Sequence, residues 1–331
     1  PPPPPPFQAE DGIRDKQICL VGSEMCIRDR IPSQDGRTAI VTGANTGIGF
    51  HNALDLARAG AHVVLACRSE ERALEAMDRI DEEVDDASTE FIALDLASQD
   101  AVRAFAETFR AGHDRLDLLI NNAGVMWVPF EQTDDGFELH MAANHFGHFL
   151  LTSLVIDLMP DDPASRVVSL SSLAHASGSK SIRFDDINWQ RHGEYKKHEA
   201  YAQTKLACLM FALELDRRLG EAGSSILSLA AHPGVSQTEL GRNIPGWQQA
   251  IVRYTIGPFI SHEPAAASLP TLMAAVDPSM TGGEYLGPTG RRELLGPPGV
   301  ATIHPCAQDE DDWKRLWELS VELTGASFPF D

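Results

Sequence analysis

Two residues four apart in the chain, Tyr201 and Lys205, could carry acid–base chemistry if they lie on a helix. Side chains at this spacing share one helix face, about one turn from each other. A free tyrosine is a poor base at neutral pH, and a lysine ammonium close by would favour its phenolate form. The alternative is a surface Tyr–Lys pair, which is common on helices, so other motifs of the chain must decide between the two interpretations.

A second feature is the glycine-rich segment TAIVTGANTGIG, in which the strand-like run 39–41 is followed by Gly43, Gly47 and Gly49. The first glycine would let the chain turn out of the strand, and the second would let the backbone approach a phosphate. The third would let the new helix pack closely on the sheet. The N-terminus of that helix offers N–H groups and a positive dipole end to a pyrophosphate. Since strand, turn and helix come in this order, we predict dinucleotide binding here.

The elements that must position these residues alternate along the chain. Apolar runs of strand type cover residues 39–41, 62–67, 91–94, 116–120, 166–170, 225–230 and 284–286, and helical patterns cover 48–58, 70–83, 99–111, 134–158, 199–219, 263–276 and 310–323. This alternation is typical of a parallel sheet with helices on both faces. We therefore predict an α/β fold, a Rossmann-type doubly wound parallel sheet of about seven strands, in one domain over residues 31–331.

Residues 1–30 do not fit this pattern. They begin with a run of prolines and continue without helical or strand periodicity. They also lack the basic start and continuous apolar core of a signal peptide. The runs FQAEDGIRD and CLVGSEMCIRD look like translated sequencing-adapter text, so we predict that residues 1–30 are a disordered, artefactual extension. A natural disordered tail is the alternative.

Composition excludes several classes of function. The chain of 331 residues is 43% hydrophobic and 23% charged, which is ordinary for a globular enzyme. A net charge of -21 and the lack of clustered Lys and Arg argue against a nucleic-acid partner. The five cysteines are scattered without a CxxC pair, which indicates a reducing compartment, no disulfide framework and no zinc site. Because no apolar run approaches the roughly 18 residues of a membrane span, we expect no transmembrane segment and a cytoplasmic protein.

Five motifs occur in one order: TGANTGIG, NNAG at 121–124, a strand end at Ser172, YAQTK at 201–205 and HPGVSQT at 232–238. Together they resemble the short-chain dehydrogenase/reductase family, over essentially all of residues 38–286. The TGxxxGxG form points to the simple single-domain subgroup of that family. The segments VVLACRSEE and NHFGHFLLT look most like its retinol-dehydrogenase-like and WW-domain-oxidoreductase-like branch.

The resemblance implies roles for four residues. Tyr201 would be the general acid in reduction and the general base in oxidation. Ser172 would donate a hydrogen bond to the substrate oxygen, with Ser171 as the competing assignment. Lys205 would also hold the nicotinamide ribose. Asn144 matches the asparagine that holds a proton-relay water, and an amide satisfied by helix contacts is the alternative.

The resemblance also implies a set of cofactor contacts. Asp95, after the third strand, would contact the adenine, and Pro233, Gly234 and Thr238 would contact the carboxamide. The full predicted set is Gly43, Asn45, Thr46, Gly47, Ile48, Gly49, Arg68, Asp95, Leu96, Asn122, Ala123, Gly124, Tyr201, Lys205, Pro233, Gly234 and Thr238.

The choice between NAD and NADP depends on the end of the second strand. An NAD enzyme would place a carboxylate there to accept from the ribose 2′-hydroxyl. This chain has neutral Cys67 followed by Arg68, whose guanidinium suits a 2′-phosphate. We therefore predict NADP rather than NAD, with a solvated helix-start charge as the alternative role of Arg68.

Three remaining features concern metals and partners. His140, His145 and His148 lie on one predicted helix, but no convergent carboxylate accompanies them, so no metal is predicted. Bulky apolar residues near the nicotinamide end, such as Met126 and Trp127, suggest a lipophilic small-molecule substrate. The helix at 199–219 is apolar around much of its circumference, which suggests a homodimer or homotetramer.

These observations favour an NADP(H)-dependent oxidoreductase that interconverts an alcohol and a ketone or aldehyde by hydride transfer. The alternative is a non-catalytic NADP(H)-binding regulatory or scaffold protein of the same fold. Replacing Tyr201 by Phe separates the two.

Overall fold

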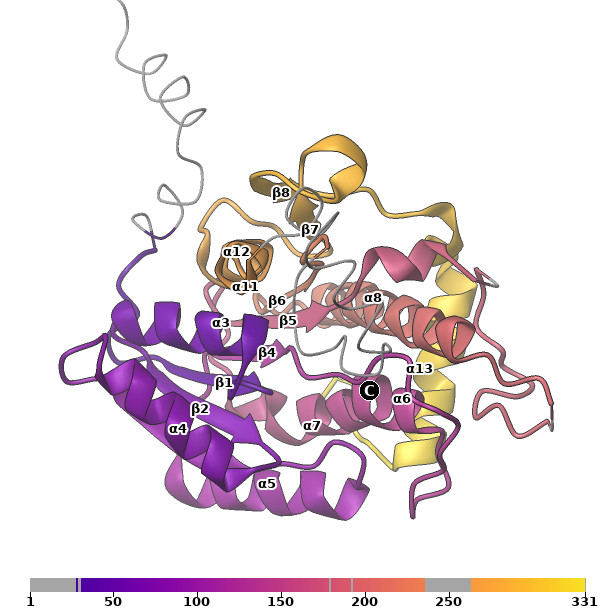
Figure 1. The fold of residues 1–331 in the computed structure, drawn as a ribbon, viewed down its shortest axis with the longest axis horizontal. Helices are drawn as coiled ribbons and strands as arrows, with labels where there is room; N and C mark the ends of the chain where they lie inside the picture. The colour runs from indigo at the N-terminus through magenta and orange to yellow at the C-terminus, as the bar shows by residue number, and fades with distance from the viewer. Residues whose placement is uncertain (1–27, 29–30, 179, 192, 236–262, 331) are drawn as a thin grey trace, which may run out of the picture.

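The computed structural model describes residues 28, 31–178, 180–191, 193–235 and 263–330 (Figure 1). Two expectations lie outside the described residues: the extension at 1–30, apart from Arg28, and the cofactor contact of Thr238. No helix in the described part of the chain is both long and apolar enough to cross a membrane.

One eight-stranded sheet organises the molecule, in the order β3-β2-β1-β4-β5-β6-β7-β8. Its strands are β1 Thr38–Thr42, β2 His62–Cys67, β3 Ser88–Ala93, β4 Leu118–Asn121, β5 Arg166–Leu170, β6 Leu227–Ala231, β7 Tyr285–Pro288 and β8 Pro298–Val300. Every neighbouring pair is parallel except β7 and β8. The strand order reverses between β1 and β4, and at such a reversal doubly wound sheets bind their ligand in a crevice outside the carboxyl ends of the strands. The predicted doubly wound fold is confirmed.

Two strands differ from the prediction. β3 begins at Ser88 and not at residue 91. The apolar pattern missed its first residues because they are polar, as is tolerated in a strand at the edge of the sheet. β8 is an additional strand of Pro-Gly-Val, which pairs antiparallel with β7. A three-residue strand that starts with proline carries no recognisable pattern, and the outer edge of a sheet is where such a strand is tolerated.

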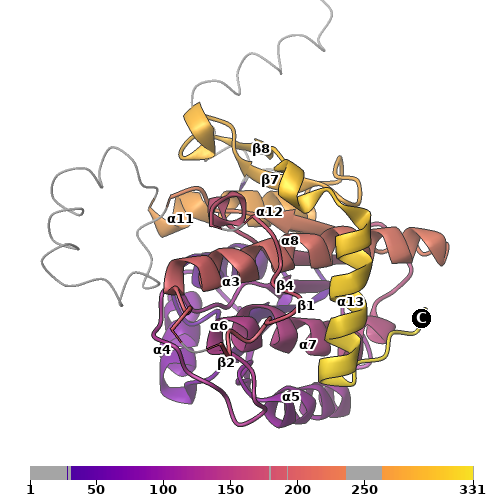
Figure 2. The same cartoon turned by 90° about the vertical axis from the view of Figure 1, so that its right-hand side faces the viewer.

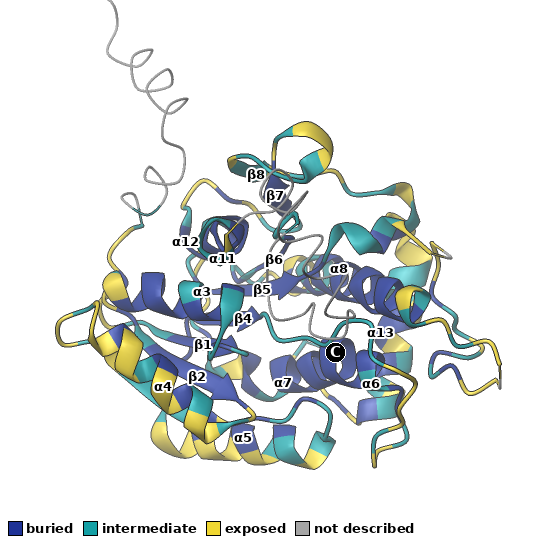
Figure 3. Cartoon of the chain, viewed as in Figure 1, coloured by how far each residue is buried: buried dark blue, intermediate teal, exposed yellow. Residues whose placement is uncertain are grey.

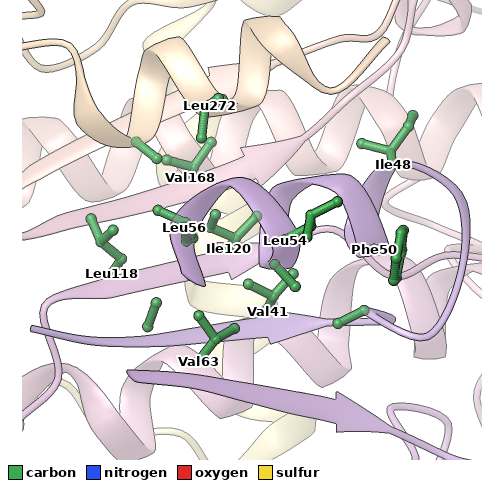
Figure 4. Close-up of a cluster of buried hydrophobic side chains, with 14 of the residues drawn as sticks. Val41, Ile48, Phe50, Leu54, Leu56, Val63, Leu118, Ile120, Val168 and Leu272 are labelled. Carbon is green, nitrogen blue, oxygen red and sulfur yellow. The ribbon is translucent and has the colours of Figure 1, made fainter. Parts of the chain in front are cut away.

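Helices cover both faces of the sheet (Figures 1 and 2). They are α3 Gly47–Arg58, α4 Glu70–Asp81, α5 Gln99–Gly112, α6 Leu139–Met141, α7 Gly147–Val155, α8 Lys197–Glu221, α11 Pro264–Ala267, α12 Leu269–Val276 and α13 Glu310–Thr324. The core on one face joins α3, α4 and α12 to alternate strand residues such as Val41, Ile120 and Val168 (Figure 4). The core on the other face joins α5, α7, α8 and α13 to the intervening residues. The strands between the two edge strands β3 and β8 are mostly buried, and the outer sides of α4 and α5 are exposed (Figure 3).

The long helix predicted at 134–158 is wrong in its start and in its regularity. Residues before Leu139 form a turn at Gly136, where φ is 84°, and Glu138 caps the helix by accepting from the Met141 N–H. A five-residue π-helical turn, Ala142–Phe146, then separates α6 from α7. A π-turn leaves no trace in apolar periodicity, and such turns are frequent at functional sites. This one carries Asn144.

The C-terminal helix explains why α8 is apolar around its circumference. α13 crosses α8 and packs against it (Figure 2). At this contact Trp317 stacks on Phe211 with the ring centroids 6.1 Å apart. The apolar surface of α8 that suggested a partner subunit is therefore covered within the same chain. A homodimer or homotetramer stays a prediction without that support.

Candidate active site

The glycine turn after β1 has the backbone conformation that the sequence suggested. Gly43 and Gly47 have φ of 66° and 58°, in the region that favours glycine. A Cβ on Gly49 would overlap the Gly43 carbonyl oxygen and lie 2.5 Å from Asn122 Nδ2. Thr46 begins α3 without a side-chain capping bond, so N–H groups of the first turn are not capped by its hydroxyl. The turn and the helix N-terminus thus fit a bound pyrophosphate.

The NNAG segment is joined to this turn through Thr42. The Thr42 hydroxyl oxygen accepts from the backbone N–H groups of Asn122 and Ala123, both at 2.9 Å. The Asn122 amide donates to the Thr42 carbonyl at 2.7 Å. β1 and β4 are therefore held together at their carboxyl ends, and Asn122 and Ala123 adjoin the glycine turn. Their contact with the cofactor stays a prediction.

His148 of α7 also contacts Thr42, the residue that joins the ends of β1 and β4. Its Nδ1 donates to the Asn144 carbonyl at 3.0 Å, so Nε2 is the acceptor that faces the Thr42 hydroxyl at 2.9 Å. Burial lowers the pKa of His148 to about 4, which keeps the ring neutral at physiological pH. The sequence did not predict that Thr42 and His148 support the site. For Thr42 the one available signal was a hydroxyl residue at the end of an apolar strand.

Asn144 is fully bonded within the protein. Its side-chain oxygen accepts from the Val125 N–H at 2.7 Å. Its amide donates to the Val125 carbonyl and to the Thr204 hydroxyl, both at 3.0 Å. The side chain therefore fixes the segment after β4 against α8, which corresponds to the alternative of a satisfied amide. The water-holding role stays a prediction for this residue.

Tyr201 and Lys205 lie together on α8, as their spacing predicts. Lys205 Nζ donates to the Leu170 carbonyl at 2.8 Å and lies 5.9 Å from the centre of the Tyr201 ring. Tyr201 is only 6% exposed. A Cβ on Gly124 would lie 3.7 Å from Lys205 Nζ, so the NNAG segment passes directly beside the ammonium group. α8 thus faces the end of β5 and the end of β4.

The two serines after β5 differ in their hydrogen bonds. Ser171 is buried and donates its hydroxyl to the Lys205 carbonyl at 2.7 Å. Ser172 is partly exposed, and its oxygen accepts from the Ala174 N–H at 3.2 Å. Accepting leaves the Ser172 hydroxyl hydrogen available to a ligand, whereas that of Ser171 is used. The geometry favours Ser172 as the substrate-facing serine.

Two arginines follow the end of β2. Cys67 is buried beneath the glycine turn, and burial raises the pKa of its thiol to about 11, so it is neutral. Arg68 is exposed immediately after it. Arg72, on the first turn of α4, adds a second positive charge near the Cys67 thiol. Sequence reasoning missed Arg72, because its proximity depends on how α4 packs.

The remaining predicted contacts lie at the same sheet edge. The Asp95 carboxylate accepts from the Ala97 N–H at 3.0 Å. The Leu96 carbonyl oxygen lies so close to Gly147 that a Cβ on this glycine would overlap it. Pro233 and Gly234 follow β6, and Gly234 has φ of 68° and no room for a Cβ beside the Leu294 carbonyl. These positions surround the crevice, except Thr238, which lies outside the described residues.

The three helix histidines have separate partners. His140 Nδ1 lies 2.6 Å from Glu138, and His145 Nε2 lies 2.8 Å from the Ser320 hydroxyl. With His148 on Thr42, the rings do not converge on one point. They act as hydrogen-bonding groups of the interior.

A cavity of about 430 Å³ lies away from this site, between α5, α7 and the C-terminal segment. Arg110 and Asp157, which pair at 2.6 Å, form part of its lining together with Phe328. None of the predicted site residues lines it, so we assign it no role in the reaction.

Known proteins that are similar to this chain include dehydrogenases. Residues 37–183 match the family model described as short chain dehydrogenase. Human retinol dehydrogenase 13 is 42% identical over 297 residues, which is 89% of this chain and 86% of the relative. Mouse polyprenol dehydrogenase is 40% identical over 302 residues, again 89% and 86%.

Two solved structures are similar over most of the chain. An uncharacterised protein from Mycobacterium paratuberculosis is 37% identical with a TM-score of 0.75, covering 91% of this chain and 98% of its own. The Pseudomonas aeruginosa RhlG/NADP active-site complex is 25% identical with a TM-score of 0.59, covering 76% and 94%.

Proposed function

Because the chain belongs to the short-chain dehydrogenase/reductase family, whose relatives here act on alcohols, we propose that it is an NADP(H)-dependent enzyme. It interconverts a lipophilic alcohol and its aldehyde or ketone. The observation that carries this proposal is the position of Lys205 on α8, bonded to the Leu170 carbonyl at the end of β5 and beside the NNAG segment that adjoins the glycine turn. Tyr201 lies one helical turn earlier on α8, and Ser172 follows β5 by two residues. When bound, the nicotinamide nucleotide supplies or accepts the hydride.

Tyr201 moves the proton in this proposal. Its hydroxyl donates to the carbonyl oxygen during reduction and takes the proton back from the alcohol during oxidation. The Lys205 ammonium, held by the Leu170 carbonyl, stabilises the phenolate that forms when the proton leaves. The free hydroxyl hydrogen of Ser172 bonds the same substrate oxygen, which carries more negative charge in the transition state than in the ketone.

NADP is the proposed cofactor because the end of β2 offers two guanidinium groups and a neutral thiol. Arg68 and Arg72 suit the doubly charged 2′-phosphate of NADP. A carboxylate at the position of Cys67, which would accept from the 2′-hydroxyl of NAD, is not present. The similar RhlG structure is a complex with NADP, in agreement with this preference.

The proposed substrate class is a long isoprenoid alcohol or its aldehyde. Retinol and polyprenol, named in the two relatives, are both of this type. Met126 and Trp127, directly after the NNAG segment, provide partly buried apolar surface near the reaction centre. Apolar lining with a few placed polar groups is the usual character of such a site.

The test mixes the protein, NADPH and a panel of aldehydes, from retinal and longer isoprenoid aldehydes to a polar sugar, and follows nicotinamide absorbance. We expect turnover of the isoprenoid aldehydes and little of the sugar. Tyr201→Phe should lower kcat by about 10³-fold while NADPH binding, measured by fluorescence, is retained. Tyr195→Phe, which removes a phenol hydroxyl that bonds Glu138 and the Val128 carbonyl, is the matched control with nearly normal kcat.

Two results would contradict the proposal. Turnover that survives Tyr201→Phe would remove the tyrosine from the mechanism. NADPH binding without turnover of any substrate in the panel would favour a regulatory or scaffold protein of the same fold.

A further inference from the structure

Three side chains meet at the opposite edge of the sheet, far from the active site. His62 is the first residue of β2 and pairs in register with Ser88, the first residue of β3. Glu90 lies two residues further along β3, so it projects from the same face as Ser88. His113 follows the last residue of α5, which covers that face. The amino ends of two strands and the end of a helix thus bring two imidazoles and a carboxylate together.

The distances suit a metal ion. Glu90 Oε2 lies 2.8 Å from His113 Nε2 and 3.4 Å from His62 Nε2. One ligand atom from each of the three residues lies within 4.8 Å of the others. In a tetrahedral zinc site with bonds of about 2.0–2.1 Å, the ligand atoms are roughly 3.3 Å apart. Small side-chain rotations would bring these atoms to that spacing.

Neighbouring groups hold both imidazole rings in place. His62 Nδ1 lies 2.8 Å from the Ser88 hydroxyl, which leaves Nε2 to face Glu90. A hydrogen bond at the second ring nitrogen is what orients metal-binding histidines. The His113 ring stacks on Phe109, one helical turn earlier, with the centroids 4.6 Å apart. Both rings therefore point to the carboxylate without help from a metal.

The cluster is also accessible. The exposed fractions of the side chains are 28% for His62, 41% for Glu90 and 17% for His113. Three protein ligands on a partly exposed surface leave a further coordination position for water. Among the described residues, these two histidines and one glutamate offer ligand atoms close enough together to share one metal ion. The helix histidines considered above do not belong to it.

We propose that His62, Glu90 and His113 bind one Zn²⁺ ion, which cross-links β2, β3 and the end of α5. The ion stabilises the folded chain by mass action, because the three ligands come from separate segments and converge only in the fold. It takes no part in hydride transfer, since it lies at the amino edge of the sheet and the crevice lies at the carboxyl edge. The alternative is a cluster joined by hydrogen bonds alone.

The experiment titrates Zn²⁺ into the full chain by calorimetry, after removal of metals with a chelator. The variants are His62→Gln, Glu90→Gln and His113→Gln, and His51→Gln, on α3 at the other face of the sheet, is the control. We expect one Zn²⁺ site in the wild type and the control, weakened by more than about tenfold in each cluster variant. Absence of binding in the wild type, or equal binding in the cluster variants, would overturn the proposal.

A second measurement does not depend on the variants folding. Co²⁺ added to the wild-type chain should give the intense visible bands of a four- or five-coordinate site, and Zn²⁺ should remove them. Zn²⁺ in large excess should also raise the Tm of the wild type by about 5 °C. If Co²⁺ gives only the weak spectrum of the hydrated ion and Zn²⁺ does not change the Tm, the three side chains are joined by hydrogen bonds alone and the proposal is wrong. Neither readout uses NADP(H) or turnover.

Discussion

The two edges of the sheet treat their polar groups differently. At the amino edge, the buried Asp117 carboxylate receives hydrogen bonds from Arg115 at 2.6 Å and from the Thr38 N–H at 2.9 Å. Arg166 donates to the Ala274 carbonyl in the same region. At the carboxyl edge, the N-terminus of α3 lacks a side-chain cap and the Ser172 hydroxyl hydrogen is available. Around Asp117 and Arg166 the closed networks support the fold, whereas the open groups at the carboxyl edge are available to a ligand of the active site.

The largest expected effect tests the open edge at its tightest point. In Gly49→Ala, the added methyl group would overlap the Gly43 carbonyl and press on Asn122. The turn must then move away from the pyrophosphate position, so we expect NADPH binding to weaken by about 100-fold. Fluorescence titration measures the Kd.

The matched control for that change is Gly112→Ala at the end of α5. A Cβ there meets nothing within 4 Å, so both binding and Tm should stay close to the wild type. Gly49→Ala with a normal Kd would mean that the turn does not hold the cofactor.

The next effect separates the two serines. Ser172→Ala removes the hydroxyl that we propose bonds the substrate oxygen, and it should lower kcat/KM by about 10²-fold with little change in Tm. Ser171→Ala removes the buried bond to the Lys205 carbonyl and should lower the free energy of unfolding by about 1 kcal/mol. Steady-state kinetics and thermal melting are compared for both. The reverse pattern would exchange their roles.

A smaller effect concerns cofactor choice at the end of β2. Arg68→Gln removes a charge-assisted bond to the 2′-phosphate and should raise the KM for NADPH by about tenfold or more. The KM for NADH should not change, since NAD has no 2′-phosphate. Arg191→Gln, which affects only an exposed pair with Asp185, is the control. Equal effects on both cofactors would show that Arg68 does not read the phosphate.

The sequence was sufficient for most of the fold because the buried strands are continuous apolar runs. β1, β2 and β5 stand within a residue of their predicted bounds, since each is buried on both faces. β8 was not predicted because three residues are too few to show an alternation of apolar and polar residues. The start of α6 was placed too early because the turn at Gly136 delays the helix. The π-turn at Asn144 depends on contacts with Val125 and Thr204 that no local pattern encodes.

For the site, spacing along one element was predictable and proximity between elements was not. Tyr201 and Lys205 share a helix, so their separation alone placed them together. Thr42 and His148 meet across 106 positions of the chain, and Glu90 meets His62 across 28. The apolar circumference of α8 was assigned to a second subunit because nothing in the sequence indicated that α13 would cover it. Long-range packing is therefore what the residues alone leave open.

A final effect, on stability and not on activity, tests the closed network around Asp117. Burial alone would raise the pKa of this carboxyl, but the bonds from Arg115 and the Thr38 N–H outweigh it and hold the pKa below its ordinary value. A lowered pKa means that the carboxylate stabilises the fold above the ordinary value of about 3.9. That contribution is lost as the pH falls through the lower folded value. Asp117→Asn should therefore lower the free energy of unfolding by about 2 kcal/mol at neutral pH.

The difference from the wild type should shrink when melting is repeated below pH 4, because the carboxyl of the unfolded wild-type chain takes up a proton there and the folded carboxyl does so at still lower pH. Asp185→Asn, at an exposed ion pair, should change neither Tm nor its pH dependence. In Asp117→Asn the kcat/KM should stay normal at temperatures where the variant is folded, because Asp117 touches only the amino edge. A fall in kcat/KM without a fall in Tm would contradict the assignment of Asp117 to stability and of the carboxyl edge to the reaction.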